Sequence, residues 1–314
     1  LQARADTEVR IDLTLLESLD AGEVRWDYTL AFRAEGKGQQ RILVSKELLL
    51  RDGVILVDRP NPDDRQDVLR LTQTHLEQVN NNVNFRAVVE HLQSTTYLHL
   101  VPQLLKHADG ISGRLLENDP FGQGLLQRIA KTTVKTRDAR LRRIQQVLAQ
   151  AVPQFSELRF LQDPISGTPH LEACYQHWRP HGAWQREDQF SDGTLRLIGL
   201  LWALQDGDGL LLLEEPELSL NDAIVSHIPL MVDRVLRKRS ASARQVIIST
   251  HSDMLLSDVS EAACVLLLQP SANGTLVRPP THEESSLIAN GLSVSEVLLP
   301  KTRIQNADQL GLFA

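Results

Sequence analysis

The stretch LLLLEEPELSLN, residues 210–221, decides the fold class of this chain. Four consecutive leucines before Glu214 and Glu215 predict a strand that is buried on both faces, as strands are in parallel sheets covered by helices. A second short apolar strand, VII at residues 246–248, is followed closely by His251. Ligands of open α/β sheets bind at the carboxyl edge of the strands, so we expect the two acids and the imidazole at one site.

A third motif, FSDGTLR at residues 190–196, precedes an apolar helix. Ser191 has a hydroxyl that suits the N-cap position, and Gly193 permits another group to approach the backbone closely. The free amides and the dipole at a helix start favour anions, so this turn is a candidate phosphate contact. Each of the three motifs, taken alone, is also typical of plain structure: a helix cap, a strand that ends in solvated acids, or a solvated histidine.

Length and composition narrow the class of protein. The 314 residues are enough for one large or two ordinary domains. A net charge of -7 argues against a chain whose whole surface wraps nucleic acid, although local basic patches remain open. Cys174 and Cys264 lie far apart in sequence, which is simplest to explain by reduced thiols. No run approaches the ~18 apolar residues that a membrane helix needs, and we see no secretory signal, so we expect a cytoplasmic protein without a membrane partner.

The first part of the chain has the pattern of antiparallel strands. Residues 7–58 alternate between apolar and polar side chains, with Asp52-Gly53 as a hairpin turn. Residues 59–65 are rich in Asp, Asn and Pro and predict a loop. Residues 95–105 predict a strand that turns into a loop at Pro102.

In the later part of the chain, the apolar residues recur with a different period. Helical periodicity appears between residues 85 and 152, and residues 156–178 predict another hairpin. From residue 189 onward, helical and buried-strand patterns alternate, as in a parallel sheet covered by helices. We therefore expect an α/β fold in three parts: antiparallel β structure at residues 1–72, a helical insertion at 73–155, and a lobe at 156–314 with the parallel-sheet core and the tail.

Two adjacent acids at a strand end can divide the work of phosphate chemistry. Glu214 would hold Mg²⁺ directly or through water, and Glu215 would orient and deprotonate the attacking water. His251 would reach the terminal phosphate or that water. The cluster Ser249, His251 and Asp253 does not suit a hydrolase triad, whose members come from separate elements.

With the three motifs in this order, the chain resembles ABC-type ATPases of the soluble RecF/SMC-like branch, often described as predicted AAA-family ATPases. The resemblance is strongest over residues 184–257. It implies that residues 190–194 are the signature loop, 210–216 the Walker B strand, 216–221 the D-loop and 249–252 the switch-histidine loop.

The resemblance also implies a mechanism and partners. In such ATPases two heads sandwich two ATP molecules, so Ser191 and Gly193 would contact the γ-phosphate bound by a second copy of the head. Asn221, at the end of the D-loop, would lie at that interface, and Gln103 is the candidate for the glutamine loop. The implied cofactors are ATP and Mg²⁺, and the implied work involves DNA, in repair or anti-phage defence. The alternative is a nucleotide-sensing or nucleotide-dead scaffold that controls an effector such as a nuclease.

One departure from the family pattern concerns nucleotide binding. The phosphate-loop motif G-x-x-x-x-G-K-S/T does not occur, because the Lys-Thr pairs at Lys131, Lys135 and Lys301 lack the preceding glycines. The resemblance places the missing strand, phosphate loop and helix before the antiparallel strands. We therefore expect them in a segment that precedes residue 1, and ATP hydrolysis depends on that segment. A smaller departure is Glu214, where transport relatives carry aspartate.

Three further patterns keep other interpretations open. Cys174, His177 and His181 have a spacing that resembles metal ligands, but no fourth ligand is recognisable, so we interpret them as a strand leading to the signature loop. A basic run between Arg128 and Arg143 fits either a DNA backbone contact or a solvated helix face. A metal-dependent nuclease would use Glu214, Glu215 and Glu217.

Overall fold

The structure is a computed structural model that describes residues 8–17, 24–36, 39–107, 119–176, 183–237, 244–257, 259, 264–271 and 274–302. The chain divides into two compact units. Unit 1 comprises Leu1–Gln93 and Pro270–Leu276, and unit 2 comprises Ser94–Gln269 and Val277–Ala314. Each unit has its own hydrophobic core. The three-part division at residues 72 and 155 stays a prediction.

Unit 1 contains a four-stranded antiparallel sheet in the order β1-β2-β3-β4. Inward-facing Trp26 and Tyr28 are buried, whereas Asp27 and Thr29 between and beyond them face the polar side. Asp52 and Gly53 both have positive φ, 49° and 80°, as a two-residue hairpin turn requires. The strands are β1 (Glu8–Leu16), β2 (Arg25–Ala34), β3 (Ile42–Arg51) and β4 (Val54–Arg59).

Short helices cover one face of this sheet. Phe85, Val88 and Val89 pack against the inward side chains of the strands. The segment that was expected as a loop contains helix α1, because Asn61 caps it in a capping box with Asp64 and a proline suits its first turn. The helices are α1 (Pro62–Gln66), η2 (Val68–Thr72), η3 (Val83–Phe85) and α2 (Arg86–Gln93).

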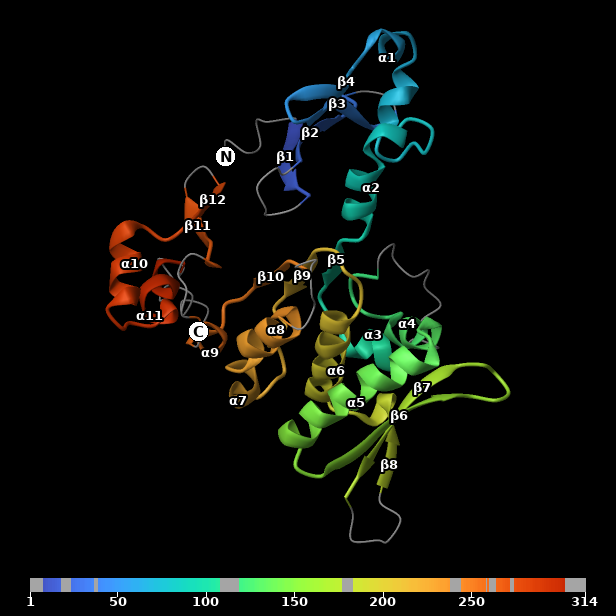
Figure 1. Cartoon of the computed structure of the whole chain (residues 1–314), viewed down its shortest axis with the longest axis vertical. Helices are drawn as coiled ribbons and strands as arrows, with labels where there is room; N and C mark the ends of the chain where they lie inside the picture. The colour runs from blue at the N-terminus through green and yellow to red at the C-terminus, as the bar shows by residue number, and fades with distance from the viewer. Residues whose placement is uncertain are drawn as a thin grey trace, which may run out of the picture. The chain divides into compact units, whose positions relative to one another are not determined.

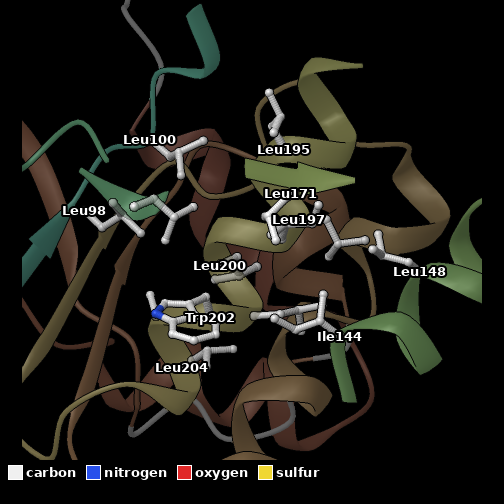
Figure 2. Close-up of a cluster of buried hydrophobic side chains, with 14 of the residues drawn as sticks. Leu98, Leu100, Ile144, Leu148, Leu171, Leu195, Leu197, Leu200, Trp202 and Leu204 are labelled. Atoms are coloured by element: carbon white, nitrogen blue, oxygen red, sulfur yellow. The ribbon is translucent and has the colours of Figure 1, made fainter. Parts of the chain in front are cut away.

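Unit 2 is built around a three-stranded parallel sheet in the order β10-β9-β5. The strands are β5 (Thr96–Leu98), β9 (Leu211–Glu214) and β10 (Val246–Ser249). Helix α6 (Asp192–Gln205) is the most deeply buried helix among the residues that the structure describes, since ten of its side chains or backbone positions are buried. Figure 2 shows its leucines and Trp202 among Leu98 and Leu100 on one side and Ile144 and Leu148 on the other.

A helical and antiparallel layer completes the core of unit 2. Helix α5 packs on α6 and on strand β6 (Figure 1). The loop expected at Pro102 is instead helix α3, because proline is well suited to a first helical position. The elements are α3 (Pro102–Lys106), α4 (Leu125–Lys131), α5 (Val134–Ala151), and the antiparallel strands β6 (Phe155–Gln162), β7 (Pro169–Tyr175) and β8 (Ala183–Arg186).

The remaining elements lead into and follow the parallel strands. Leu267, Val294, Val297 and Leu298 form a small third core near the end of the chain. No helix in the described ranges is long and apolar enough to cross a membrane. The elements are η4 (Glu187–Gln189), α7 (Asp222–Val225), α8 (Ile228–Arg237), α9 (Asp253–Ser257), the pair β11 (Leu267–Ser271) and β12 (Gly274–Arg278), α10 (His282–Ala289), α11 (Val294–Leu298) and η6 (Leu299–Lys301).

This mixed α/β architecture, with an antiparallel sheet and a parallel-sheet core, confirms the fold class expected from the sequence. The four leucines at residues 210–213 do lead into the central strand of the parallel sheet. The carboxyl edge of that sheet is therefore the place to look for the acids and the histidine.

Candidate functional site

The carboxyl ends of the three parallel strands coincide. Ser249 pairs with Glu214 across β10 and β9, and Leu98 pairs with Leu213 across β5 and β9. The pairing continues one residue further, because the backbone N–H of Glu215 donates to the carbonyl of Ser249 over 3.0 Å. Parallel strands in register end at the same edge, so the side chains that follow them are brought together.

Glu215 and His251 face each other across this edge. His251 Nε2 lies 4.0 Å from Glu215 Oε1, which is the outer limit of an ion pair. The histidine side chain is 84% exposed and the glutamate side chain 32% exposed, so the imidazole is free to turn toward a ligand. Glu215 has a φ of 42°, a left-handed conformation that is unusual for a residue with a side chain and that occurs mostly where the surrounding structure enforces it.

Glu214 is contacted by Tyr97, in strand β5, and by His99, which directly follows that strand. The hydroxyl of Tyr97 donates to Glu214 Oε2, and Nδ1 of His99 lies 3.4 Å from the backbone carbonyl of Glu214. The hydrogen bond to Glu214 raises the pKa of Tyr97, so the phenol keeps its proton. Sequence reasoning missed Tyr97 and His99. The expected strand at residues 95–101 was a usable signal, because a strand that joins β9 in parallel delivers its own last side chains to the same edge.

The helix start at residues 191–194 is capped within the chain. Ser191 Oγ accepts from the backbone N–H of Thr194 over 3.1 Å and lies 2.8 Å from Thr194 Oγ1. A Cβ at Gly193 would lie 2.5 Å from the carbonyl oxygen of Ser219. Glycine is thus required here by the close approach of the segment that follows the carboxylates, whatever else the turn binds.

Gln103 and Lys106 of helix α3 both bind Asp192. Gln103 Nε2 donates to Asp192 Oδ2 over 2.5 Å, and Lys106 Nζ donates to Asp192 Oδ1 over 2.8 Å. The hydrogen bond from Lys106 is the main cause of the lowered pKa of Asp192. The structure therefore brings Gln103 to the helix start that carries Ser191 and Gly193. Lys106 is a further contact that the sequence analysis did not anticipate.

The segment after Glu215 leads to Asn221, which caps helix α7 by accepting from the backbone N–H of Ala223 over 2.9 Å. Midway along it, Glu217 accepts a hydrogen bond from the hydroxyl of Thr250, a residue adjacent to His251. Ser219 has a φ of 62°. The residues expected as signature loop, D-loop and switch-histidine loop are thus near one another within one chain.

No group of three or more His, Cys, Asp or Glu side chains in the described part of the chain is arranged to hold a metal ion. His177 and His181 lie outside the described residues, so the metal-ligand-like spacing that they form with Cys174 stays untested. Mg²⁺ in nucleotide sites is held by one or two carboxylates together with waters and phosphate oxygens. Glu214 and Glu215 supply hard oxygen donors of this kind, and their chemistry fits the cation.

A family match gives the class of protein, an AAA domain. Residues 6–258 match the family described as "AAA domain, putative AbiEii toxin, Type IV TA system", and the chain belongs to this family. The match confirms the resemblance to predicted AAA-family ATPases. A comparison with curated proteins gives no match.

Several solved structures are similar to this chain at low identity. An Smc head bound to the C-terminal winged-helix domain of ScpA has 14% identity and a TM-score of 0.47, covering 88% of this chain and 76% of its own. The Smc head of Pyrococcus furiosus bound to the C-terminal domain of ScpA has 11% identity and a TM-score of 0.42, covering 91% and 80%. The SMC head of Thermotoga maritima has 12% identity and a TM-score of 0.41, covering 88% and 75%.

Proposed function

We propose that this chain forms the catalytic and signature parts of an ATPase head that binds ATP with Mg²⁺ and hydrolyses it between two copies of itself. The observation that carries the proposal is the register of Glu214 with Ser249, which aligns the acids and His251 at one strand edge. Family membership supports the same chemistry. The cytoplasmic location expected from the sequence belongs to this proposal.

Each residue at the edge has a role in the proposed reaction. Glu215 accepts the proton of the attacking water, and His251, which is largely exposed, contacts the terminal phosphate. Glu214 holds the metal, and when bound, Mg²⁺ neutralises charge on the phosphate oxygens. The backbone amides at Ser191 and Gly193 contact the phosphate held by the second copy.

Gln103 and Asn221 have supporting roles in this proposal. Gln103 holds Asp192 at the start of α6 and thereby sets the position of the phosphate-binding turn. Asn221 caps α7 and fixes the end of the D-loop that lies at the interface of the two copies. A phosphate loop in the same polypeptide is required for hydrolysis, and the experiments below use the full-length gene product for this reason.

The direct test is an assay of ATP binding and phosphate release by the full-length protein, with Mg²⁺ and with EDTA. We expect phosphate release that depends on Mg²⁺. Binding of ATP without release would favour the alternative, a nucleotide-sensing scaffold that holds or releases an effector such as a nuclease. Cleavage of DNA in Mg²⁺ without ATP would favour a nuclease that uses Glu214, Glu215 and Glu217, and we expect none.

Tyr97 competes with the metal for Glu214, which gives a prediction for the variant Tyr97→Phe. Removing the hydroxyl frees Glu214 Oε2, so Mg²⁺ no longer has to displace a hydrogen bond to a charged group. We expect half-maximal activation of ATP hydrolysis at a Mg²⁺ concentration lower by about two- to tenfold, since a partly exposed hydrogen bond contributes about 0.5–1.5 kcal/mol net and about 1.4 kcal/mol corresponds to tenfold. Tyr175→Phe, which removes a hydroxyl from the core on β7, is the control and should leave this concentration unchanged. A higher Mg²⁺ requirement in Tyr97→Phe would contradict this role.

DNA contact is a further part of the proposal, and helix α5 is its favoured surface. Some cations of the basic run are paired: Arg128 binds Asp119 at 3.3 Å and Arg140 binds Asp206 at 2.7 Å. Arg142, in contrast, forms no ion pair in the described ranges and lines a groove with Arg137 and Arg159. The lining also includes Phe160, over which the Arg137 guanidinium lies 4.1 Å from the ring centre. Arg159 of this groove binds Glu172 at 2.7 Å and Arg137 lies 3.5 Å from Asp138. Arg142 is therefore the cation of the groove that suits a phosphate oxygen.

The variant Arg142→Glu tests this surface. We expect affinity for double-stranded DNA to fall by about fivefold at low salt, and the salt dependence of log K to become shallower by about one, as for loss of one phosphate contact. Arg234→Glu makes the same change of charge on the exposed side of α8 and serves as the matched control. Equal effects of the two variants, measured by fluorescence anisotropy, would show that only net charge matters and would exclude the α5 groove.

A further inference from the structure

Two buried polar atoms of opposite charge near the proposed site have no partner among the described residues. They are Nε of Arg196, on helix α6, and Oε2 of Glu217, in the segment after β9. A buried donor or acceptor without a partner is unfavourable, and each such atom in a folded protein calls for an explanation. Here a buried donor and a buried acceptor without partners both lie near the carboxyl edge of the parallel sheet.

Arg196 lies against the end of the carboxylate strand. Its side chain lines a small cavity with Glu214 and Pro216, beside Leu98 and Leu213 at the ends of their strands. Burial lowers the pKa of Arg196, and the charges of Asp192, Glu215 and Glu217 act against that shift. The guanidinium is therefore within electrostatic reach of these acids, although its Nε has no hydrogen-bond partner among the described residues.

The segment that carries Glu217 is held in an unusual conformation. We define residues 215–219 as the carboxylate turn. Both of its ends, Glu215 and Ser219, have positive φ, and such conformations persist only where contacts enforce them. The close approach of Ser219 to Gly193 holds the turn on one side, and the hydrogen bond from Thr250 to Glu217 Oε1 holds it on the other.

Glu217 thus stands between two parts of the site. One carboxylate oxygen binds Thr250, next to His251, while the other oxygen is buried without a partner. Relaxing Glu215 and Ser219 from positive φ would change the direction in which Glu217 projects from the turn. Arg196, which lines the cavity beside Pro216, is a cation that can satisfy the second oxygen.

We propose that Arg196 is a positioning residue that pairs with Glu217 when the nucleotide is bound, and so couples helix α6 to the carboxylate turn. This inference rests on the proposed ATPase function. In the paired state, the helix that begins with Ser191 and Gly193 and the turn that begins with Glu215 move as one body. In the structure, both atoms are without a hydrogen-bond partner among the described residues.

The test uses the full-length protein with Arg196→Gln, Glu217→Gln, the double variant, and Arg196→Lys. Glutamine at position 217 keeps an oxygen for Thr250, so the comparison isolates the charge facing Arg196. Thermal unfolding is measured with and without ATP and Mg²⁺, together with kcat and KM for hydrolysis. Glu283→Gln removes an exposed charge in α10 and is the matched control.

Coupling between the two positions should appear only with nucleotide. Without ATP, the effects of the single variants on unfolding should add. With ATP and Mg²⁺, the double variant should be no less stable to unfolding than either single variant. This departure from additivity should correspond to about tenfold in the unfolding equilibrium constant, as is typical of a close charge pair. We expect kcat to fall by about tenfold in each single variant, KM to change by less than about twofold, and Arg196→Lys to retain most activity.

The outcomes separate this inference from the function on which it rests. Additive effects in the presence of ATP, or equal coupling with and without it, would overturn the inference while leaving the ATPase intact. A wild-type protein that binds no ATP would overturn both. A Glu283→Gln variant that loses as much activity as Arg196→Gln would show that the losses are unrelated to position.

Discussion

Replacing Glu215 by glutamine is expected to lower the rate of ATP hydrolysis by at least about a hundredfold, the range for loss of a general base, while ATP binding persists. Glutamine has the shape of glutamate and keeps the backbone hydrogen bond to Ser249, but its amide cannot take a proton from water. ATP should therefore remain bound and hold two heads together. The fraction of dimer in the presence of ATP should rise.

Rapid-quench assays of phosphate release and sedimentation with and without ATP measure the two effects. The variant Glu283→Gln, with the same chemical change on the exposed side of α10, should behave as the wild type in both. Unchanged turnover in Glu215→Gln would show that another group is the base. A Glu215→Gln variant that no longer binds ATP would show that Glu215 contributes to nucleotide binding and is not the general base.

Arg59 in unit 1 is the centre of a buried charge network, and its replacement is expected to have a large effect on the free energy of unfolding. Its guanidinium binds Glu47 at 2.9 Å and Asp64 at 2.9 Å, and all three side chains are at most 1% exposed. It also donates to the backbone carbonyls of Gln73 and Arg70, which ties the segment after β4 to strand β3. Removing this cation takes the ion-pair partner from Glu47 and leaves Asp64 with Arg70 alone, at 3.3 Å.

The variant Arg59→Met is therefore expected to destabilise unit 1 by about 3–5 kcal/mol, the range for breaking a buried ion pair. Urea denaturation followed by the fluorescence of Trp26, which lies in the core of the unit, measures the change. Arg10→Met breaks an exposed pair with Asp12 in the same sheet and should leave the free energy of unfolding nearly unchanged. Similar losses in the free energy of unfolding for the two variants would contradict a stabilising role of the buried network.

The same network gives a dependence on pH. Burial raises the pKa of Asp64, but hydrogen bonds from Arg59 and from the backbone of Asn61 outweigh it, and the pKa falls to about 2. Because the folded value lies below the ordinary value of 3.8, the contribution of Asp64 is fully present above that pH. It is lost as the pH falls through about 2. In Arg59→Met this loss should begin at higher pH.

The local pattern predicted much of this chain. Runs of leucine, valine and isoleucine identified two of the parallel strands, β9 and β10, and the Asp52-Gly53 turn and the hairpin of β6 and β7 lie where they were expected. The start of α6 at Ser191 was also predicted. These features depend on the period of apolar residues and on the chemistry of single turns, both of which can be read within a few neighbouring positions. The loops predicted at residues 59–65 and at Pro102 were wrong for the same local reason. Proline is common both in loops and at the first positions of a helix, and the local pattern does not distinguish the two.

What the sequence alone determined is which side chains end the strands: Glu214, Glu215 and His251 follow apolar runs, whatever surrounds them. Only the tertiary structure decided what those side chains meet. Tyr97 reaches Glu214 across 117 positions of the chain, and Gln103 reaches Asp192 across 89. The contact of Gly193 with Ser219 and the unpaired charges of Arg196 and Glu217 likewise depend on how α6 packs beside β9. Periodicity tells which face of an element is buried, whereas the partner on that face is set by the path of the whole chain.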